Sequence, residues 1–333
     1  MNKNPFIFGR PVKKENFYNR KEEVDAATAF LKKLQSFSVV GERRIGKTSF
    51  LQHILSRDVL KEHGIDPEEY IAVNFNVSSL HEISRGEFIK DIVERIREQT
   101  QIEVEAENIF EMLKAYMKKL ALSGKNLIIA LDEFEVIAPI LDDSFSHWLR
   151  FIFQSSNVVA ITASQTTVRE LETSGGTASP LFNIFGNIFL KLFRRDQTEN
   201  MIRKMFQKGG IELSEDEIAF LADLSGGNPC LIQLIGYYYY EEKKKNRKII
   251  REKFKESMFP HTNDQFESYW KHLTKEEKKF LIHPENSKDD QISRILERKG
   301  FIFMKEGKWK IFSTLFQEFV KNKARTDKDL VFD

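Results

Sequence analysis

Three patterns of apolar residues occur along the first 194 residues of the chain. Short, largely apolar runs at residues 37–40, 127–131, 158–162 and 188–192 predict buried strands. Residues 71–77 instead alternate apolar and polar side chains, which predicts a strand at or near a sheet edge. Apolar positions at helical spacing over 21–34, 88–97 and 109–120 predict helices that pack on these strands. We therefore expect an α/β fold with a parallel sheet and helices on both of its faces.

The apolar pattern becomes helical from residue 196, and the predicted elements change again after Leu273. Helices are predicted over 275–281 and 290–299, followed by short strands at 301–304 and 309–312. Helix, helix and β-hairpin in this order are typical of a winged helix. We expect a core domain over residues 1–194, a helical lid subdomain over 195–260, a winged helix over 261–323 and a flexible tail over 324–333.

A glycine-rich motif stands between the first predicted strand and the helix that follows it. Residues 41–48 read Gly-Glu-Arg-Arg-Ile-Gly-Lys-Thr and fit G-x-x-x-x-G-K-[ST] at every fixed position. In such a phosphate loop the backbone N–H groups point at phosphate oxygens, and the helix dipole begins where negative charge must lie. Lys47 is predicted to reach the β- and γ-phosphates of ATP, and Thr48 to bind Mg²⁺. The predicted nucleotide contacts in this stretch are Gly41, Arg44, Gly46, Lys47, Thr48 and Ser49.

The apolar run at 127–131 ends in two carboxylates, Asp132 and Glu133, as a Walker B strand does. Carboxylates at the carboxyl end of a buried parallel strand lie where open α/β sheets bind ligands. Asp132 is predicted to hold Mg²⁺ through water. Glu133 is predicted to orient and deprotonate the water that attacks ATP.

Polar residues at the end of the next strand and an arginine in the helix before it are less specific signals of a catalytic role. Thr162, Ser164 and Gln165 lie at the end of the next strand, where a polar group could reach the γ-phosphate of ATP; ordinary capping of a strand end is the alternative. Arg150 lies near the end of the preceding helix, a position that resembles the one from which an arginine of AAA+ assemblies often acts on the nucleotide of a neighbouring subunit; a plain surface arginine is the alternative. We include Gln165 and Arg150 among the candidate catalytic residues.

Composition limits the remaining possibilities. The 333 residues contain 52 Lys and Arg against 50 Asp and Glu, a formal charge of +2, so any nucleic-acid surface must be local. Cys230 is the only cysteine, and no apolar run approaches the length of a membrane span. These features predict a cytoplasmic protein that does not interact with membranes.

Two short stretches carry a family resemblance. Phe17-Tyr18-Asn19-Arg20-Lys21-Glu22-Glu23 resembles the F-x-G-R-x-x-E box that contacts adenine in AAA+ initiators and STAND ATPases, with Asn19 where the family usually has glycine. Gly226-Gly227-Asn228-Pro229 predicts a helix stop followed by a helix start. It also resembles the G-x-P element of STAND ATPases, which implies that Pro229 lies near the bound adenine. With both Walker motifs and the predicted winged helix, the chain is identified as a STAND-like, archaeal-type P-loop ATPase.

The resemblance implies a nucleotide-dependent switch that is closed with ADP and opened or assembled with ATP, and a homo-oligomer is compatible with it. STAND proteins commonly carry effector and sensor domains on the same chain. Because the core and winged helix take up these 333 residues, we expect effector or sensor proteins to act in trans, in a multi-protein system such as defence or signalling.

The competing interpretation is an AAA+-type ATPase that acts on duplex DNA in replication, transposition or recombination. Residues 271–323 hold thirteen basic and eight acidic side chains. Candidate phosphate contacts are Arg294, Arg298, Lys299, Lys305, Lys308 and Lys310, but Asp289, Asp290, Glu297 and Glu306 are interleaved with them. This mixture favours contact with protein over contact with DNA. A small-molecule kinase would require neither the Asp132–Glu133 pair nor a winged helix.

Overall fold

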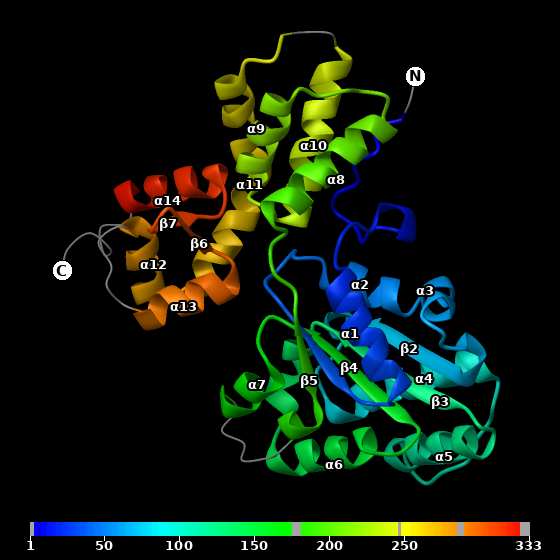
Figure 1. The fold of residues 1–333 in the computed structure, drawn as a ribbon. Coiled ribbons are helices and arrows are strands. Elements are labelled where there is room, and N and C mark those ends of the chain that lie inside the picture. Colours follow the sequence, from blue (N-terminus) through cyan, green and yellow to red (C-terminus); the bar gives the residue numbers. More distant parts are fainter. Residues whose placement is uncertain (1–2, 175–180, 246–247, 285–289, 327–333) are drawn as a thin grey trace. The chain divides into compact units, whose positions relative to one another are not determined.

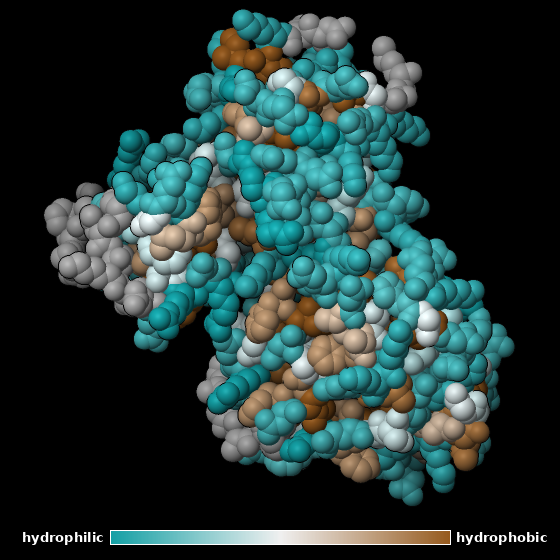
Figure 2. All heavy atoms as spheres, in the orientation of Figure 1, coloured by the Kyte–Doolittle hydropathy of each residue, from teal (hydrophilic) through white to brown (hydrophobic). Residues whose placement is uncertain are grey.

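The computed structural model describes residues 3–174, 181–245, 248–284 and 290–326. Contacts divide the chain into two compact units. The α/β unit comprises Lys13–Gly41 and Lys47–Leu190, and the helical unit comprises Met1–Val12, Glu42–Gly46 and Lys191–Asp333. In the part of the chain that is described, no helix is both long and apolar enough to cross a membrane. Most side chains visible in Figure 2 are hydrophilic.

The α/β unit is built on a five-stranded sheet in the order β2-β3-β4-β1-β5, and every neighbouring pair of strands is parallel (Figure 1). The strand predicted to lie at an edge, β2, is an edge strand, as expected from its alternating pattern. The strands are β1 (Phe37–Val40), β2 (Tyr70–Asn76), β3 (Asn126–Asp132), β4 (Val158–Ser164) and β5 (Gly186–Phe189).

Helices cover both faces of this sheet (Figure 1). Alternate residues of β2, β3 and β4 share one apolar core with α4, α5 and α6, and α1 and α2 lie on the other face. The helices are α1 (Lys21–Lys32), α2 (Lys47–Ile54), α3 (Arg57–Glu62), α4 (Arg85–Thr100), α5 (Ile109–Leu122), α6 (Asp143–Phe153) and α7 (Val168–Ser174). Short 3₁₀ turns are η1 (Lys14–Asn16), η2 (Pro67–Glu69), η3 (Val77–Ser79), η4 (Phe134–Ile140) and η5 (Leu181–Ile184).

The helical unit contains the C-terminal helices and the C-terminal hairpin (Figure 1). Its first part consists of α8 (Arg195–Lys208), α9 (Glu215–Ser225), α10 (Pro229–Lys244) and α11 (Arg251–His272). Its second part consists of α12 (Lys275–Ile282), α13 (Asp290–Lys299), the antiparallel strands β6 (Ile302–Lys305) and β7 (Lys308–Ile311), and α14 (Thr314–Thr326). The order helix, helix, hairpin agrees with the elements predicted over residues 275–312, and α14 follows the hairpin.

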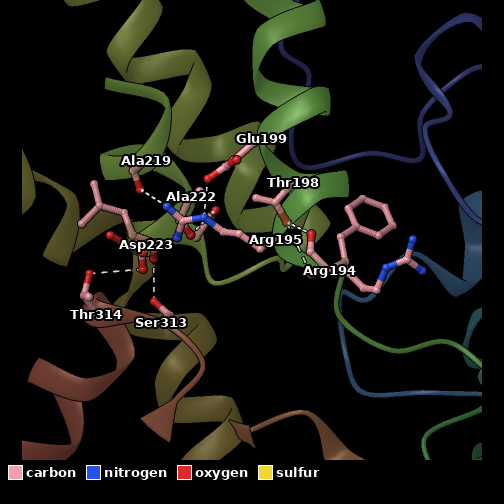
Figure 3. A network of polar contacts seen from close by, with 12 residues as sticks. Arg194, Arg195, Thr198, Glu199, Ala219, Ala222, Asp223, Ser313 and Thr314 are labelled. Atoms are coloured by element: carbon pink, nitrogen blue, oxygen red, sulfur yellow. Dashed lines mark hydrogen bonds and ion pairs between the residues drawn. The ribbon is translucent and has the colours of Figure 1, made fainter. Parts of the chain in front are cut away.

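The two parts of the helical unit are tied together where α9 ends. Arg195 of α8 forms an ion pair with Asp223 of α9 (Figure 3). Ser313 donates a buried hydrogen bond of 2.6 Å to the carbonyl of Leu224, and Thr314 donates one of 3.3 Å to the carbonyl of Asp223 (Figure 3). The start of α14 is therefore anchored to the last turn of α9.

The glycine pair after α9 is required by close packing. Gly226 and Gly227 have φ of 56° and 78°, a left-handed backbone that favours glycine. A Cβ on Gly226 would lie 2.0 Å from the carbonyl oxygen of Phe312, and one on Gly227 would lie 2.2 Å from that of Phe193. Only glycine lets the chain turn this tightly against two backbone segments.

Several predicted boundaries differ from the structure. The strand expected to reach residue 192 ends at Phe189, because its partner β1 ends at Val40, opposite Phe189. The first helix ends at Lys32, since Leu34 takes a φ of 51°. Helix α11 continues through Pro260, where the sequence indicated a domain boundary, and α14 extends to Thr326. The rest of the predicted tail, residues 327–333, lies outside the described residues.

Candidate active site

The predicted phosphate loop connects β1 to α2. Its start is fixed by the N–H of Gly41, which donates a 3.1 Å hydrogen bond to the carbonyl of Ser164 at the end of β4. Arg44 and Gly46 take positive φ values of 60° and 100°, and α2 begins directly after them at Lys47. Other residues are strained at the backbone of Gly46, so the motif's second glycine has a conformational role. The loop thus turns into the N-terminus of a helix, where the backbone favours anions.

Lys47 lies across this loop. Its side chain is mostly buried, with 8% of the residue exposed, and Nζ donates a 2.7 Å hydrogen bond to the carbonyl of Gly41. The hydrogen bond therefore keeps the ammonium group beside the first residue of the phosphate loop. This is the position from which a lysine can contact phosphate groups bound by the loop.

Thr48 and Asp132 meet between α2 and β3. The Thr48 hydroxyl donates to Oδ2 of Asp132 at 2.5 Å, and only 3% of Asp132 is exposed. Burial raises the pKa of the Asp132 carboxyl, and the hydrogen bond from Thr48, the charge of Lys47 and the N–H of Glu133 oppose this effect. A hydroxyl and a carboxylate are oxygen ligands suited to Mg²⁺. Among the described residues no group of three or more His, Cys, Asp or Glu could hold a metal, so phosphates and water would have to complete its coordination.

Glu133 differs from its neighbour in environment. Its side chain is exposed, and its backbone is left-handed, with φ of 55° and ψ of 43°. Its N–H donates a 3.0 Å hydrogen bond to Oδ1 of Asp132. Strained backbone of this kind concentrates at functional sites. The turn separates the two carboxylates, so that one is buried beside Thr48 and the other is accessible.

The three polar candidates at the end of β4 have different surroundings. Thr162 is fully buried and its hydroxyl donates to Oγ of Ser38 at 2.9 Å, which joins β4 to β1. The Ser164 hydroxyl donates to the carbonyl of Thr166 at 2.5 Å. Gln165 is partly exposed, and its Nε2 donates to Oε1 of Glu135 at 3.0 Å. Glu135 was not predicted, because a single carboxylate within the apolar stretch 134–140 gives no sequence signal.

Arg150 is not brought to this site within the chain. It lies in the last turn of α6, and its Nε donates to Oε1 of Gln154 at 3.3 Å. Helix α6 returns the chain from the carboxyl end of β3 to the amino end of β4. Its last turn therefore lies near the amino ends of these parallel strands, whereas Asp132 lies at the carboxyl end of β3.

The two stretches with a family resemblance adopt defined backbones. Asn19 takes a φ of 63°, the left-handed conformation that a glycine at this position adopts easily. The ring of Phe17 stacks on His53 of α2 at 3.8 Å, a contact that sequence spacing does not reveal. Pro229 is the first residue of α10, and the Asn228 side chain caps this helix by accepting from the N–H groups of Cys230 and Leu231.

Residues 17–235 match the model of a family described as an ATPase domain predominantly from Archaea. Among solved structures, the Walker-type ATPase of Pyrococcus abyssi is 17% identical with a TM-score of 0.65, and the match covers 94% of this chain and 99% of that chain. The ORC2 protein of Aeropyrum pernix, in ADPNP–ADP complexes, is 12% identical with a TM-score of 0.60, covering 98% and 99%. The ORC1 protein of Aeropyrum pernix in complex with DNA is 14% identical with a TM-score of 0.53, covering 93% of each chain. At these identities the likeness concerns the fold. No curated protein matches the chain.

Proposed function

Because the chain belongs to the family of ATPase domains found predominantly in Archaea, we propose that it binds ATP with Mg²⁺ and hydrolyses it as a STAND-like molecular switch. The observation that carries this proposal is the contact between Thr48 and Asp132. It brings together a helix N-terminus, a hydroxyl and a buried carboxylate, which are groups suited to bind a nucleoside triphosphate and its metal ion.

Each polar group of the site has a role in this proposal. The backbone of residues 41–48 and Ser49 bind the phosphates, and Lys47 leaves the Gly41 carbonyl to contact the β- and γ-phosphates. Thr48 and Asp132 would hold Mg²⁺, and the bound ion would neutralise charge on the phosphate oxygens. The exposed Glu133 takes the proton of the attacking water, and Gln165, oriented by Glu135, contacts the γ-phosphate.

We further propose that hydrolysis is slow until other proteins act on the switch. The C-terminal elements α12 to α14 with the β6–β7 hairpin would form a winged helix that contacts effector or sensor proteins. Phe303 and Met304 support this, because they are 43% and 48% exposed on that hairpin and offer apolar contact area. Arg150, directed away from its own site, would act only on the nucleotide of a second copy.

Nucleotide binding tests the first step. Lys47→Ala removes the ammonium from the loop and should abolish binding of a fluorescent ATP analogue, or nearly so. Lys33→Ala, which removes an exposed lysine at the end of α1, should leave the affinity unchanged. Full affinity of the Lys47→Ala variant would refute the phosphate-loop assignment.

Duplex DNA is the second candidate partner. Lys305, Lys308 and Lys310 are exposed on the β6–β7 hairpin beside Phe303 and Met304, and the ORC1 protein of similar fold was solved with DNA. The basic side chains of α13 contribute less than their number suggests. Lys299 forms a 2.6 Å ion pair with the buried Glu277, so it is not available to a phosphate. Arg294 and Arg298 are exposed.

A further inference from the structure

Tyr269 of α11 forms a buried hydrogen-bonded centre in the helical unit. Only 4% of the residue is exposed, and its hydroxyl has three partners. It donates to the carbonyl of Arg43 at 3.1 Å, and it accepts from Nδ2 of Asn228 at 3.2 Å and from Nε2 of Gln265 at 2.6 Å. Arg43 belongs to the phosphate loop, whose residues 42–46 cluster with this unit.

The chemistry of the partners fixes every proton in this centre. A backbone carbonyl can only accept, so the single hydroxyl proton of Tyr269 points at Arg43. Both amides must therefore present their NH₂ groups to the phenol oxygen. The amide oxygens are used elsewhere, because Asn228 caps α10 and Oε1 of Gln265 accepts from the Arg44 guanidinium at 3.2 Å. Three buried side chains are thus satisfied in one arrangement only, which makes the centre rigid.

Helix α11 holds two consecutive residues of the phosphate loop through this centre. Tyr269 binds the carbonyl of Arg43, and Gln265, one turn earlier, binds the side chain of Arg44. Ser268 adds an exposed contact, since its Oγ accepts from the Arg43 guanidinium at 3.3 Å. The left-handed backbone of Arg44, with φ of 60°, lies directly beside these contacts.

Tyr269 is linked to two other parts of the helical unit, to one by its hydroxyl and to the other by its ring. Through Asn228 it reaches the N-terminus of α10, next to Pro229. The tyrosine ring packs against Phe301 at 5.4 Å and Phe316 at 6.0 Å, so the C-terminal elements set its position.

We propose that Tyr269 is a positioning residue for ATP binding, because its hydroxyl fixes the Arg43 carbonyl and with it the geometry of the phosphate loop. The inference rests on the proposed function, since it requires that the loop bind nucleotide. Its consequence is reciprocal: if the packing of α11 changes the affinity for ATP, bound ATP changes the packing of α11 by the same free energy. Tyr269 thereby reports nucleotide occupancy to the C-terminal elements.

Tyr269→Phe removes the hydroxyl and keeps the ring. The matched control is Tyr240→Phe, which also removes a buried hydroxyl that donates to a backbone carbonyl, that of Gly209 at 2.8 Å. Both variants should lose thermal stability to a similar extent. Only Tyr269→Phe should raise the KM for ATP, by about tenfold as expected for one hydrogen bond, with kcat changed by less than about twofold.

Hydrogen exchange provides a second measurement. Addition of ATP should change the exchange of α11 amides in the wild type and in Tyr240→Phe, and this change should be lost in Tyr269→Phe. If the two variants have the same KM and the same exchange response, Tyr269 is only a packing residue and the inference is overturned.

The remaining outcomes are also decisive. If Tyr269→Phe does not fold, Gln265→Glu replaces it, because the new carboxylate cannot donate to the phenol and draws the hydroxyl proton away from Arg43. A rise in KM again supports the inference, and an unchanged KM overturns it. If the wild type binds ATP no better than Lys47→Ala does, the proposed function fails, whatever the behaviour of Tyr269→Phe.

Discussion

The hydroxyl of Thr48 donates a hydrogen bond of 2.5 Å to Oδ2 of Asp132, although 84 residues separate the two along the chain. The sheet order explains this contact. Strand β4 lies between β3 and β1, so the helix after β1 reaches across the end of β4 to the carboxylate that ends β3. Because all three strands are parallel, their carboxyl ends lie at the same end of the sheet, where open α/β sheets bind ligands.

Substitution of Thr48 should alter the requirement for Mg²⁺. Thr48→Ala removes the hydroxyl ligand and leaves the buried Asp132 without this partner, so the Mg²⁺ concentration for half-maximal ATP turnover should rise about tenfold or more. Thr48→Ser keeps the hydroxyl and should stay within about twofold of the wild type. A magnesium titration of ATPase activity measures both. Equal behaviour of the alanine and serine variants would argue against a ligand role for Thr48.

Protonation of Glu217 at acid pH should make the helical unit less stable. Partial burial raises the pKa of this carboxyl, but hydrogen bonds from Lys243, from the N–H of Ser214 and from Tyr239 outweigh it, and the net pKa lies below the ordinary 4.5. A carboxyl whose pKa is lower in the folded state stabilises the fold above its unfolded pKa, and this contribution is lost as pH falls through the folded pKa. Glu217→Gln should therefore cost about 1 kcal/mol at pH 7, with a difference from wild type that shrinks towards acid pH.

Glu215→Gln on the same helix is the control for this effect. Glu215 is mostly exposed and pairs with Arg203 at the surface, so its loss should change stability little. Urea unfolding at several pH values measures both variants. If the difference in unfolding free energy between Glu217→Gln and wild type does not depend on pH, the ionised form of Glu217 is not the source of the stabilisation.

The basic residues of the C-terminal elements allow a test of the DNA alternative. If these elements bind duplex DNA, joint replacement of Arg294, Arg298 and Lys308 by alanine should weaken binding. It should also lower the slope of log K against log salt by about 0.9 for each lost phosphate contact. Replacement of Lys32, Lys33 and Lys118, which are exposed on the α/β unit, removes the same charge and should change neither quantity. Fluorescence anisotropy with a labelled duplex, in a salt series, separates the two. Unchanged affinity of the first variant removes the main support for DNA binding.

Sequence pattern predicted most of the fold because the features involved are local. The buried strands at 127–131 and 158–162 are largely continuous apolar runs, which indicates central strands. The strand at 71–77 alternates apolar and polar residues, which indicates an edge strand. Residues 290–299 form the predicted helix at its predicted bounds. The strand end at Phe189 could not be predicted, since it depends on where the partner strand β1 stops.

Contacts between distant segments are what the sequence did not reveal. The motifs identify Lys47 and Asp132, but not the glutamate at 135 that holds Gln165, nor the stacking of His53 on Phe17. Tyr269 has no motif at all. Its significance depends on a carbonyl 226 residues earlier in the chain, which only folding brings within hydrogen-bond distance.

Steady-state ATP turnover of the purified protein, wild type beside Glu133→Gln, tests the central claim most directly. Glu133→Gln removes the proposed general base and keeps the shape of the side chain, so nucleotide binding should persist while turnover falls by about two orders of magnitude or more. The same assay with and without duplex DNA separates the two candidate functions. We predict slow wild-type turnover that does not respond to DNA and is lost in the variant. Strong stimulation by DNA would favour the DNA-acting ATPase, and equal turnover of wild type and Glu133→Gln would contradict the proposed active site.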